Sequence, residues 1–321
     1  MKDINNKYLI ETGIGLQDVD KLKNSTYFLN ETNRYIKGEI SLNQLDSIIN
    51  SYYESKPIDS SREEEADKVS IRITKLLLDK SFSLNINQLL SIHRTLFDGL
   101  LEHPGEFRKY NISKKEWVLN GESVIYSDFR DIEKSLSYDL NEEKKFSYKG
   151  RSIDEIIEHL ALFIANLWQI HGFSEGNTRT IAVFFIKYLR ILGFNVTNDT
   201  FIKYSWYFRN SLVRANYNDL SKNIYADYSF LNKFLKNLLL NEHNVLLNRE
   251  LHVNEVNRTN ETSTKETKII SLIKENPYIT TSELSMKIGV SIRTIKSILK
   301  VLKDTNKIKR INGRRYGYWE I

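Results

Sequence analysis

Apolar residues recur at helical spacing along most of the chain, and in two stretches they occupy nearly every face of the expected helix. These stretches are residues 153–170 (IDEIIEHLALFIANLWQI) and residues 180–194 (TIAVFFIKYLRILGF). A helix that is apolar all round is buried inside a domain. Weaker helical patterns lie on both sides, for example over residues 42–54 and 228–240. We therefore predict a mainly α fold, a helical bundle with the two apolar helices at its centre.

One segment departs from the helical pattern. In residues 115–128 (KEWVLNGESVIYSD), two short apolar runs flank Asn120-Gly121. An Asn-Gly pair favours a tight two-residue turn, because both residues tolerate positive φ. The segment is therefore predicted to form a small β-hairpin that projects from the bundle.

The C-terminal segment has a pattern of its own. Thr280 with Glu283, and then Ser291, are typical starts of two successive helices, and Gly289 lies in the turn between them. Two short strands are expected around Asn312-Gly313. This order of helices and strands resembles a winged helix-turn-helix domain.

The pattern divides the chain into four parts. We expect an N-terminal helical segment over residues 1–60, a helical domain over 61–252, a linker over 253–264 and the winged domain over 265–321. The linker is assigned because the sequence there has no apolar periodicity.

The net charge of +6 is unevenly distributed. From Lys265 to the C-terminus there are 13 Lys and Arg against 5 Asp and Glu, whereas the rest of the chain holds 34 against 36. A basic segment with this helical pattern favours double-stranded DNA as a partner. A solvated basic face or a protein-binding module is the alternative. The candidate DNA-binding residues are Arg293, Thr294, Lys296 and Lys300 on the last helix, and Arg314 and Arg315 in the wing.

Composition excludes several kinds of chemistry. The chain has no cysteine, which excludes a disulfide scaffold, a thiolate zinc site and a cysteine nucleophile. It shows no secretory leader and no apolar run long enough to span a bilayer, so we expect a soluble cytoplasmic protein without membrane contacts. His93, His159 and His243 lie in helical patterns and are expected to serve packing or to face solvent.

A polar loop interrupts the two apolar helices at residues 170–180 (IHGFSEGNTRT). Gly and Asn at a helix start leave backbone N–H groups unpaired, and the helix dipole adds positive charge, so the loop suits phosphate. Arg179 can donate to a second phosphate. Glu175 offers oxygen ligands that suit Mg²⁺, and His171 can act as a general base near neutral pH. Phe173 is expected to be a buried anchor. Capping or packing explains each residue alone, but together they indicate phosphate chemistry on a nucleotide.

The loop resembles the Fic family motif, His-x-Phe-x-(Asp/Glu)-Gly-Asn-x-Arg. The similarity extends over about residues 61–252 and includes the segments HPGEFRKYNI and SWYFRNSLVRANY. The resemblance implies an all-helical bundle that transfers AMP from ATP to a protein hydroxyl. It makes His171 the base and Glu175 the Mg²⁺ ligand. It implies phosphate contacts at Gly176, Asn177, Thr178 and Arg179, and a target-aligning flap at Val124, Ile125, Tyr126 and Ser127.

Three departures from the family pattern concern regulation and the nucleotide. Gly172 stands where proline is common, and Ala182 where many members have a second arginine. In such members that arginine contacts the γ-phosphate and pairs with an inhibitory glutamate in an upstream (Ser/Thr)-x-x-x-Glu-(Gly/Asn) motif. No clean copy of that motif is present, because residues 61–65 have the spacing but Ala66 follows. The N-terminal stretch YIKGEISLNQL, within residues 1–60, resembles the antitoxin-type segment found beside some Fic domains, and in that alignment the inhibitory position falls near Asp20. We therefore expect that inhibition is absent, or that it uses residues other than this arginine–glutamate pair.

The sequence predicts an ATP- and Mg²⁺-dependent protein adenylylyltransferase that modifies a Ser, Thr or Tyr hydroxyl and carries a DNA- or partner-binding tail. The alternative is a transcription regulator whose Fic domain senses a nucleotide without turnover. Ala182 also leaves open a different phosphate-containing donor. A second copy of the chain is a further candidate partner.

Overall fold

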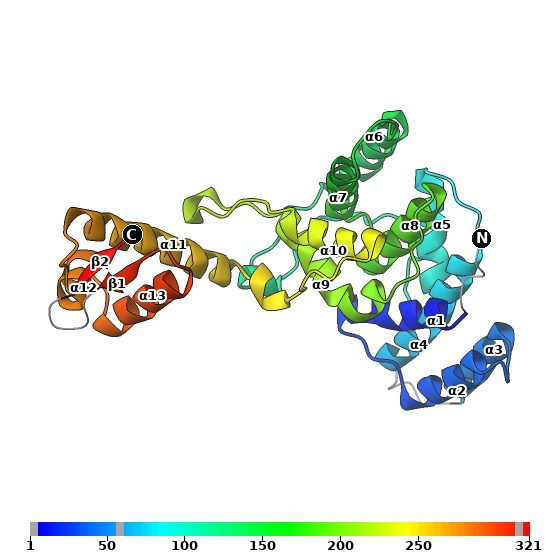
Figure 1. Cartoon of the computed structure of the whole chain (residues 1–321). Coiled ribbons are helices and arrows are strands. Elements are labelled where there is room, and N and C mark those ends of the chain that lie inside the picture. The colour runs from blue at the N-terminus through cyan, green and yellow to red at the C-terminus, as the bar shows by residue number, and fades with distance from the viewer. Residues whose placement is uncertain (1–5, 56–60, 312–316) are drawn as a thin grey trace. The chain divides into compact units, whose positions relative to one another are not determined.

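The chain divides into two compact units, Met1–Leu251 and His252–Ile321. The computed structural model describes residues 6–55, 61–311 and 317–321, with the backbone alone at residue 61 and at residues 254–264. Figure 1 shows the helices that make up most of both units.

The first unit is built from helices (Figure 1). In its described residues the remaining regular pairing is an isolated bridge between Asp219 and Ile224. With η marking 3₁₀ helices, its elements are α1 (Asn6–Gly15), η1 (Leu16–Asp20), α2 (Thr26–Ile36), α3 (Leu42–Glu54), α4 (Ser61–Leu78), α5 (Ile86–Phe97), η3 (Trp117–Leu119), η4 (Phe129–Asp131), α6 (Ile132–Lys145), α7 (Ile153–Ile170), α8 (Asn177–Ile191), α9 (Thr200–Ala215), η5 (Leu220–Lys222), α10 (Ser229–Leu240) and η6 (Asn248–Leu251).

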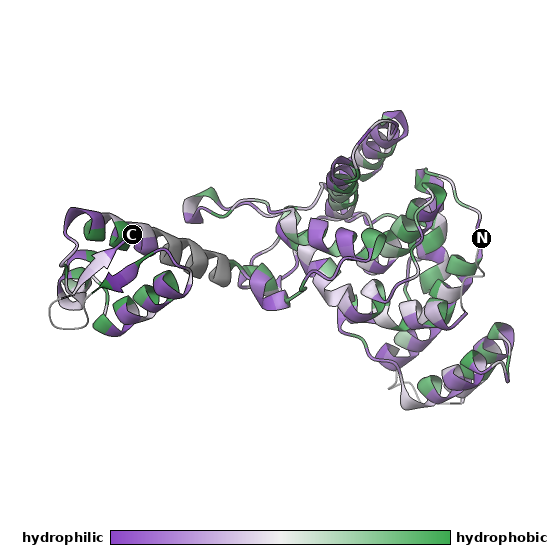
Figure 2. Ribbon diagram, viewed as in Figure 1, coloured by the Kyte–Doolittle hydropathy of each residue, from purple (hydrophilic) through white to green (hydrophobic). Residues whose placement is uncertain are grey.

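Helix α8 lies at the centre of this unit, as its apolar sequence predicts, whereas α7 is buried on one side only and leaves Ile153 and Leu162 exposed. Every residue of α8 from Asn177 to Leu189 is buried. Helix α8 packs against α4, α5, α7 and η1, and its ribbon is largely hydrophobic in Figure 2. The loop between α7 and α8 is therefore held by two helices that cannot easily move.

The N-terminal helices belong to the same compact unit. Helix α1 packs on α4 and α9, and η1 contacts α8. A buried carboxylate fixes this arrangement: Asp67 on α4 accepts hydrogen bonds from Ser25 N (3.0 Å), Ser25 Oγ (2.6 Å), Tyr53 Oη (2.7 Å) and Asn24 Nδ2 (3.0 Å). Several donors on one carboxylate offset the cost of burying it. The segment that contains η1 is thereby placed beside the polar loop.

The β-hairpin predicted at residues 117–125 is not formed. Trp117–Leu119 is a turn of 3₁₀ helix, because Leu119 N donates to Glu116 O (3.1 Å) and Asn120 N donates to Trp117 O (3.3 Å). Between the two arms of the turn, the backbone bonds are those from Glu116 N to Glu122 O (3.0 Å) and from Gly121 N to Glu116 O (2.9 Å), which is too few for a pair of strands. Asn120 and Gly121 do have positive φ, so the turn was correctly predicted and its flanking strands were not.

The second unit has the order of elements that the sequence predicts. It contains α11 (Val253–Glu275), α12 (Thr281–Ile288), α13 (Ile292–Asp304), β1 (Lys309–Ile311) and β2 (Tyr318–Glu320). The two strands are antiparallel, with Arg310 opposite Trp319. Thr280 and Glu283 form a capping box, Gly289 ends α12 at φ 76°, and Ser291 caps α13. Residues 253–264, expected as a linker without periodicity, form the first part of α11.

Candidate active site

The polar loop is bounded by two residues with left-handed backbone. His171 caps the C-terminus of α7 with φ 51° and ψ 54°, and Gly176 precedes α8 with φ 73°. A Cβ atom at position 176 would lie 2.3 Å from the ring of Phe97, so glycine is required there by both conformation and space. The left-handed conformation at His171 costs energy in a residue with a side chain, and such strain is concentrated at functional sites.

Asn177 and Thr178 turn their side chains into the protein. Asn177 Nδ2 donates to Phe173 O (2.7 Å), and Phe173 N donates to Asn177 Oδ1 (2.9 Å). Thr178 Oγ1 accepts from Trp168 Nε1 (3.0 Å). Phe173 is buried, as predicted for the anchor of the loop. These side chains hold the loop in shape, so any contact of these two residues with phosphate falls to their backbone N–H groups in the first turn of α8.

His171 is a buried imidazole with an unsatisfied nitrogen. Its side chain lies against the ring of Tyr126 with 4.2 Å between ring centroids, the residue is 4% exposed, and Nε2 has no hydrogen-bond partner in the described structure. Burial, and after it the charge of Lys114, lowers the pKa of His171 well below its ordinary value. The ring is therefore neutral near pH 7. Nδ1 lies 3.4 Å from Trp168 O, and a ring that donates there keeps a lone pair on Nε2.

Arg108 holds the start of the loop, a role that sequence reasoning missed. Its guanidinium is buried and donates to four backbone carbonyls. Nε donates to His171 O (2.8 Å), Nη1 to Tyr110 O (2.7 Å), and Nη2 to Ser127 O (2.5 Å) and Ile170 O (3.3 Å). One side chain thus fixes His171 relative to the predicted flap. In the sequence Arg108 lies in a polar segment with no periodicity, which gives no sign of burial.

His93 holds the other end of the loop and was expected only to pack. Gly105 N donates to its Nδ1 (2.8 Å), so Nε2 carries the proton and donates to Glu175 O (3.1 Å). The ring also stacks on Phe173 at 3.8 Å. Burial lowers the pKa of His93 to about 4, which keeps this donor pattern near neutral pH.

Glu175 is the exposed carboxylate of the loop. Its side chain is 60% exposed, and Lys114 Nζ lies 3.3 Å from Oε2. In the described part of the chain, no three His, Cys, Asp or Glu side chains are grouped to hold a metal ion. One accessible carboxylate nevertheless fits Mg²⁺, which commonly takes one or two protein carboxylates and fills its shell with phosphate oxygens and water.

Arg179 is held by the N-terminal helices and α4. Its side chain is 2% exposed. Nε lies 2.8 Å from Asp20 Oδ2, Nη2 donates to Glu65 Oε1 (2.5 Å), and Nη1 donates to Gln17 Oε1 (3.1 Å). The guanidinium also lies 4.8 Å from the centre of the Phe97 ring. Its predicted phosphate contact therefore requires that these partners release it.

The predicted flap is an extended segment beside the loop. Val124 and Tyr126 are buried, whereas Ile125 between them is 84% exposed. Gln169 Nε2 donates to Ile125 O (3.0 Å), and Arg108 binds Ser127 O. This alternation is that of a β-strand, although no neighbouring strand is present in the described residues.

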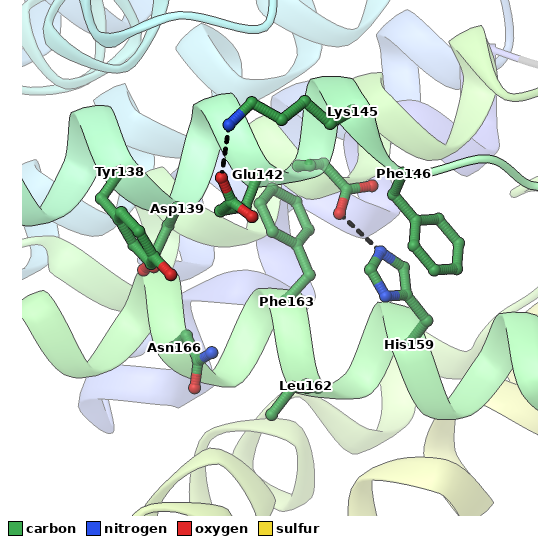
Figure 3. A pocket seen from close by; sticks show the side chains of 10 residues that line it. Tyr138, Asp139, Glu142, Lys145, Phe146, His159, Leu162, Phe163 and Asn166 are labelled. Carbon is green, nitrogen blue, oxygen red and sulfur yellow. Dashed lines mark hydrogen bonds and ion pairs between the residues drawn. The ribbon is translucent and has the colours of Figure 1, made fainter.

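A cavity of about 410 Å³ lies away from the loop, between α6 and α7. Figure 3 shows Tyr138, Asp139 and Glu142 facing His159 and Asn166 across it. The ten lining residues are Tyr138, Asp139, Glu142, Glu143, Lys145, Phe146, His159, Leu162, Phe163 and Asn166.

The buried Glu143 in this cavity has a structural role. It accepts hydrogen bonds from His159 Nε2 (2.6 Å), Tyr188 Oη (2.5 Å) and the hydroxyl of Tyr148. These bonds join α6 to α7 and α8 and satisfy the carboxylate, so Glu143 is not available to the loop.

The second unit presents the candidate DNA-binding residues on α13. Ile295, Ile298, Leu299 and Leu302 are buried in its core. The opposite face exposes Arg293, Thr294, Lys296 and Lys300. Arg314 and Arg315 lie outside the described residues.

Comparison with known proteins identifies both domains. Residues 83–189 match the Fic/DOC family, and residues 263–309 match the winged helix-turn-helix DNA-binding family. Among solved structures, the chain is similar to a Fic family protein from Desulfovibrio desulfuricans G20, at 13% identity and a TM-score of 0.44, covering 100% of this chain and 88% of the other. No curated protein matches the sequence. No helix in the described ranges is long and apolar enough to cross a membrane.

Proposed function

Because residues 83–189 form a Fic/DOC family domain and residues 263–309 a winged helix-turn-helix domain, we propose that the protein transfers AMP from ATP to a Ser, Thr or Tyr hydroxyl of a protein. The observation that supports this proposal most directly is the environment of His171. Its imidazole is neutral and buried, and its Nε2 has no hydrogen-bond partner among the described residues. It lies at the start of the polar loop, and the first backbone N–H groups of α8 lie at the end of that loop. ATP is abundant in the cytoplasm, which is where we place the reaction.

In this mechanism the target hydroxyl gives its proton to Nε2 of His171. The hydroxyl oxygen forms a bond to the α-phosphorus as the bond to the β-phosphate breaks, and pyrophosphate leaves. The first backbone N–H groups of α8 donate to the phosphate oxygens on which charge develops. Glu175 would hold Mg²⁺, which neutralises charge on the phosphates. Arg108 and His93 keep both ends of the loop in place during the transfer.

The flap supplies a site for the target. Residues 124–127 are extended, and the side chain of Ile125 points to solvent. An extended target segment can add beside this segment as a strand, which would present its hydroxyl to His171.

The test is mass spectrometry of the full chain after incubation with ATP and Mg²⁺. We expect covalent addition of AMP to the protein itself or to an added target. His171→Ala should abolish it and leave ATP affinity within about threefold, because the base does not bind the nucleotide in the ground state. His103→Ala, which changes an exposed histidine, is the matched control and should keep full activity. Transfer at the wild-type rate by His171→Ala would refute the mechanism.

Two observations favour a second candidate function, that of a DNA-binding regulator that senses a nucleotide without turnover. They are the winged domain and the ion pair that holds the guanidinium of Arg179 on Glu65. It would bind double-stranded DNA, with a second copy of the chain as a candidate partner. In that case ATP would change DNA affinity equally in the wild type and in His171→Ala, and no AMP would be transferred.

A further inference from the structure

The polar loop, residues 170–180, contains one cationic side chain, Arg179, and this side chain is already engaged within the protein. The guanidinium of Arg179 is bound to Gln17, Asp20 and Glu65. One turn further along α8, Ala182 is apolar and fully buried. A nucleoside triphosphate carries several negative charges, and apart from Mg²⁺ at Glu175 the loop offers them only the partial positive charges of its backbone N–H groups. A phosphate-binding cation is therefore expected to come from outside the loop.

Three cationic side chains lie close enough to His171 to lower its pKa: Lys114, Arg209 and Arg108. Arg108 is fixed by four carbonyl groups. Arg209 forms two hydrogen bonds with the buried carboxylate of Glu116, at 2.6 and 3.0 Å. Both arginines are already fully engaged within the protein. Of the three, Lys114 is the cation that a ligand can reach.

Lys114 has the position and freedom that such a role needs. Its side chain is 26% exposed, and its Nζ forms a single ion pair, 3.3 Å long, with the exposed Glu175. Its backbone is fixed, because Lys114 N donates to Ser123 Oγ (3.1 Å). A lysine on a fixed backbone can turn its ammonium group from a carboxylate to a phosphate at little cost, since exposed ion pairs are weak.

We propose that Lys114 is a phosphate-binding residue of this site and sets its preference for nucleotides with several phosphates. In the unliganded protein its ammonium group stays near Glu175. With a nucleotide and Mg²⁺ bound, Glu175 would hold the metal ion, and the ammonium group of Lys114 would then donate to phosphate oxygens. The proposal rests on the proposed function for the identity of the nucleotide, but it concerns binding and not transfer.

The test is calorimetric titration of the full chain with ATP, AMP and adenosine in the presence of Mg²⁺, on a His171→Ala background that prevents turnover. Lys114→Met should weaken ATP binding about tenfold, the usual effect of losing one charge-assisted hydrogen bond. Adenosine binding should stay within about twofold, and Lys114→Arg should retain most of the ATP affinity. Lys115→Met is the matched control, because Lys115 is the adjacent residue and is exposed.

The outcomes separate this proposal from the proposed function. Equal ATP affinity in Lys114→Met and Lys115→Met would overturn the role of Lys114, whether or not AMP is transferred. An equal loss for ATP and adenosine would also overturn it, because that result indicates damage to the site as a whole. If Lys114→Met selectively weakens ATP binding and the wild type transfers no AMP, the proposed transfer fails and the role of Lys114 stands. If the wild type binds no ATP, both fail.

Discussion

At the scale of single residues, the pKa of His171 decides the pH range in which the site can work. Burial and Lys114 lower it, so the neutral base persists below the ordinary pKa of histidine, about 6.5. We expect kcat/KM for transfer to stay constant as pH falls from 8 through about 6.5, and to decline only below it. Lys114→Met removes a charge that lowers this pKa, so the decline should move to higher pH. Lys115→Met should leave the profile unchanged. A wild-type decline centred at or above about pH 6.5 would contradict the assignment of His171 as a buried neutral base.

At the scale of elements, the contact of η1 and α4 with α8 restrains Arg179. Replacing one carboxylate by its amide, as in Glu65→Gln or Asp20→Asn, weakens an ion pair of Arg179, which under the proposed function competes with phosphate for this guanidinium. We expect ATP affinity and self-modification to rise about fivefold, equivalent to roughly 1 kcal/mol. Thermal unfolding should report lower stability, because Arg179 stays buried with fewer partners. Asp18→Asn changes an exposed carboxylate on the same 3₁₀ helix and should alter neither quantity. If ATP affinity and self-modification in Glu65→Gln and Asp20→Asn equal those of the wild type, the contact of η1 and α4 with Arg179 does not inhibit the protein.

At the scale of the whole molecule, the excess of basic residues is concentrated in the second unit. The segment from Lys265 to the C-terminus carries 13 basic against 5 acidic residues and includes the exposed lysines of α13. We expect the full chain to bind duplex DNA with an affinity that falls steeply with salt. Lys296→Gln and Lys300→Gln should each reduce the slope of log K against log salt by about 0.9, because each releases one counterion fewer. Lys80→Gln, an exposed charge in the other unit, should not change the slope. Gel shifts at several salt concentrations measure this, and an unchanged slope in both variants of α13 would exclude them from the DNA interface.

The sequence by itself determined the features that depend on local hydrogen bonding and periodicity. The apolar sequence of α8 predicted its burial, and Thr280, Gly289 and Ser291 marked the ends of helices in the winged domain. Helix caps and turns are made within a few residues, so a local pattern is enough to place them. The same holds for the loop, where spacing alone brings His171, Glu175 and the start of α8 together.

Contacts between distant segments were decided only by the tertiary structure. Arg179 reaches Gln17, 162 residues earlier, and His93 reaches Glu175, 82 residues later. The hairpin predicted around Asn120 failed for a related reason: the turn is local, but a strand needs a partner, and η3 forms its own short-range bonds instead. A one-dimensional pattern reports which face of a segment is apolar, but it does not report which charged group from another element meets that face once the core has packed. The sequence therefore determined which chemical groups are in the loop, and packing determined which of them are free to act.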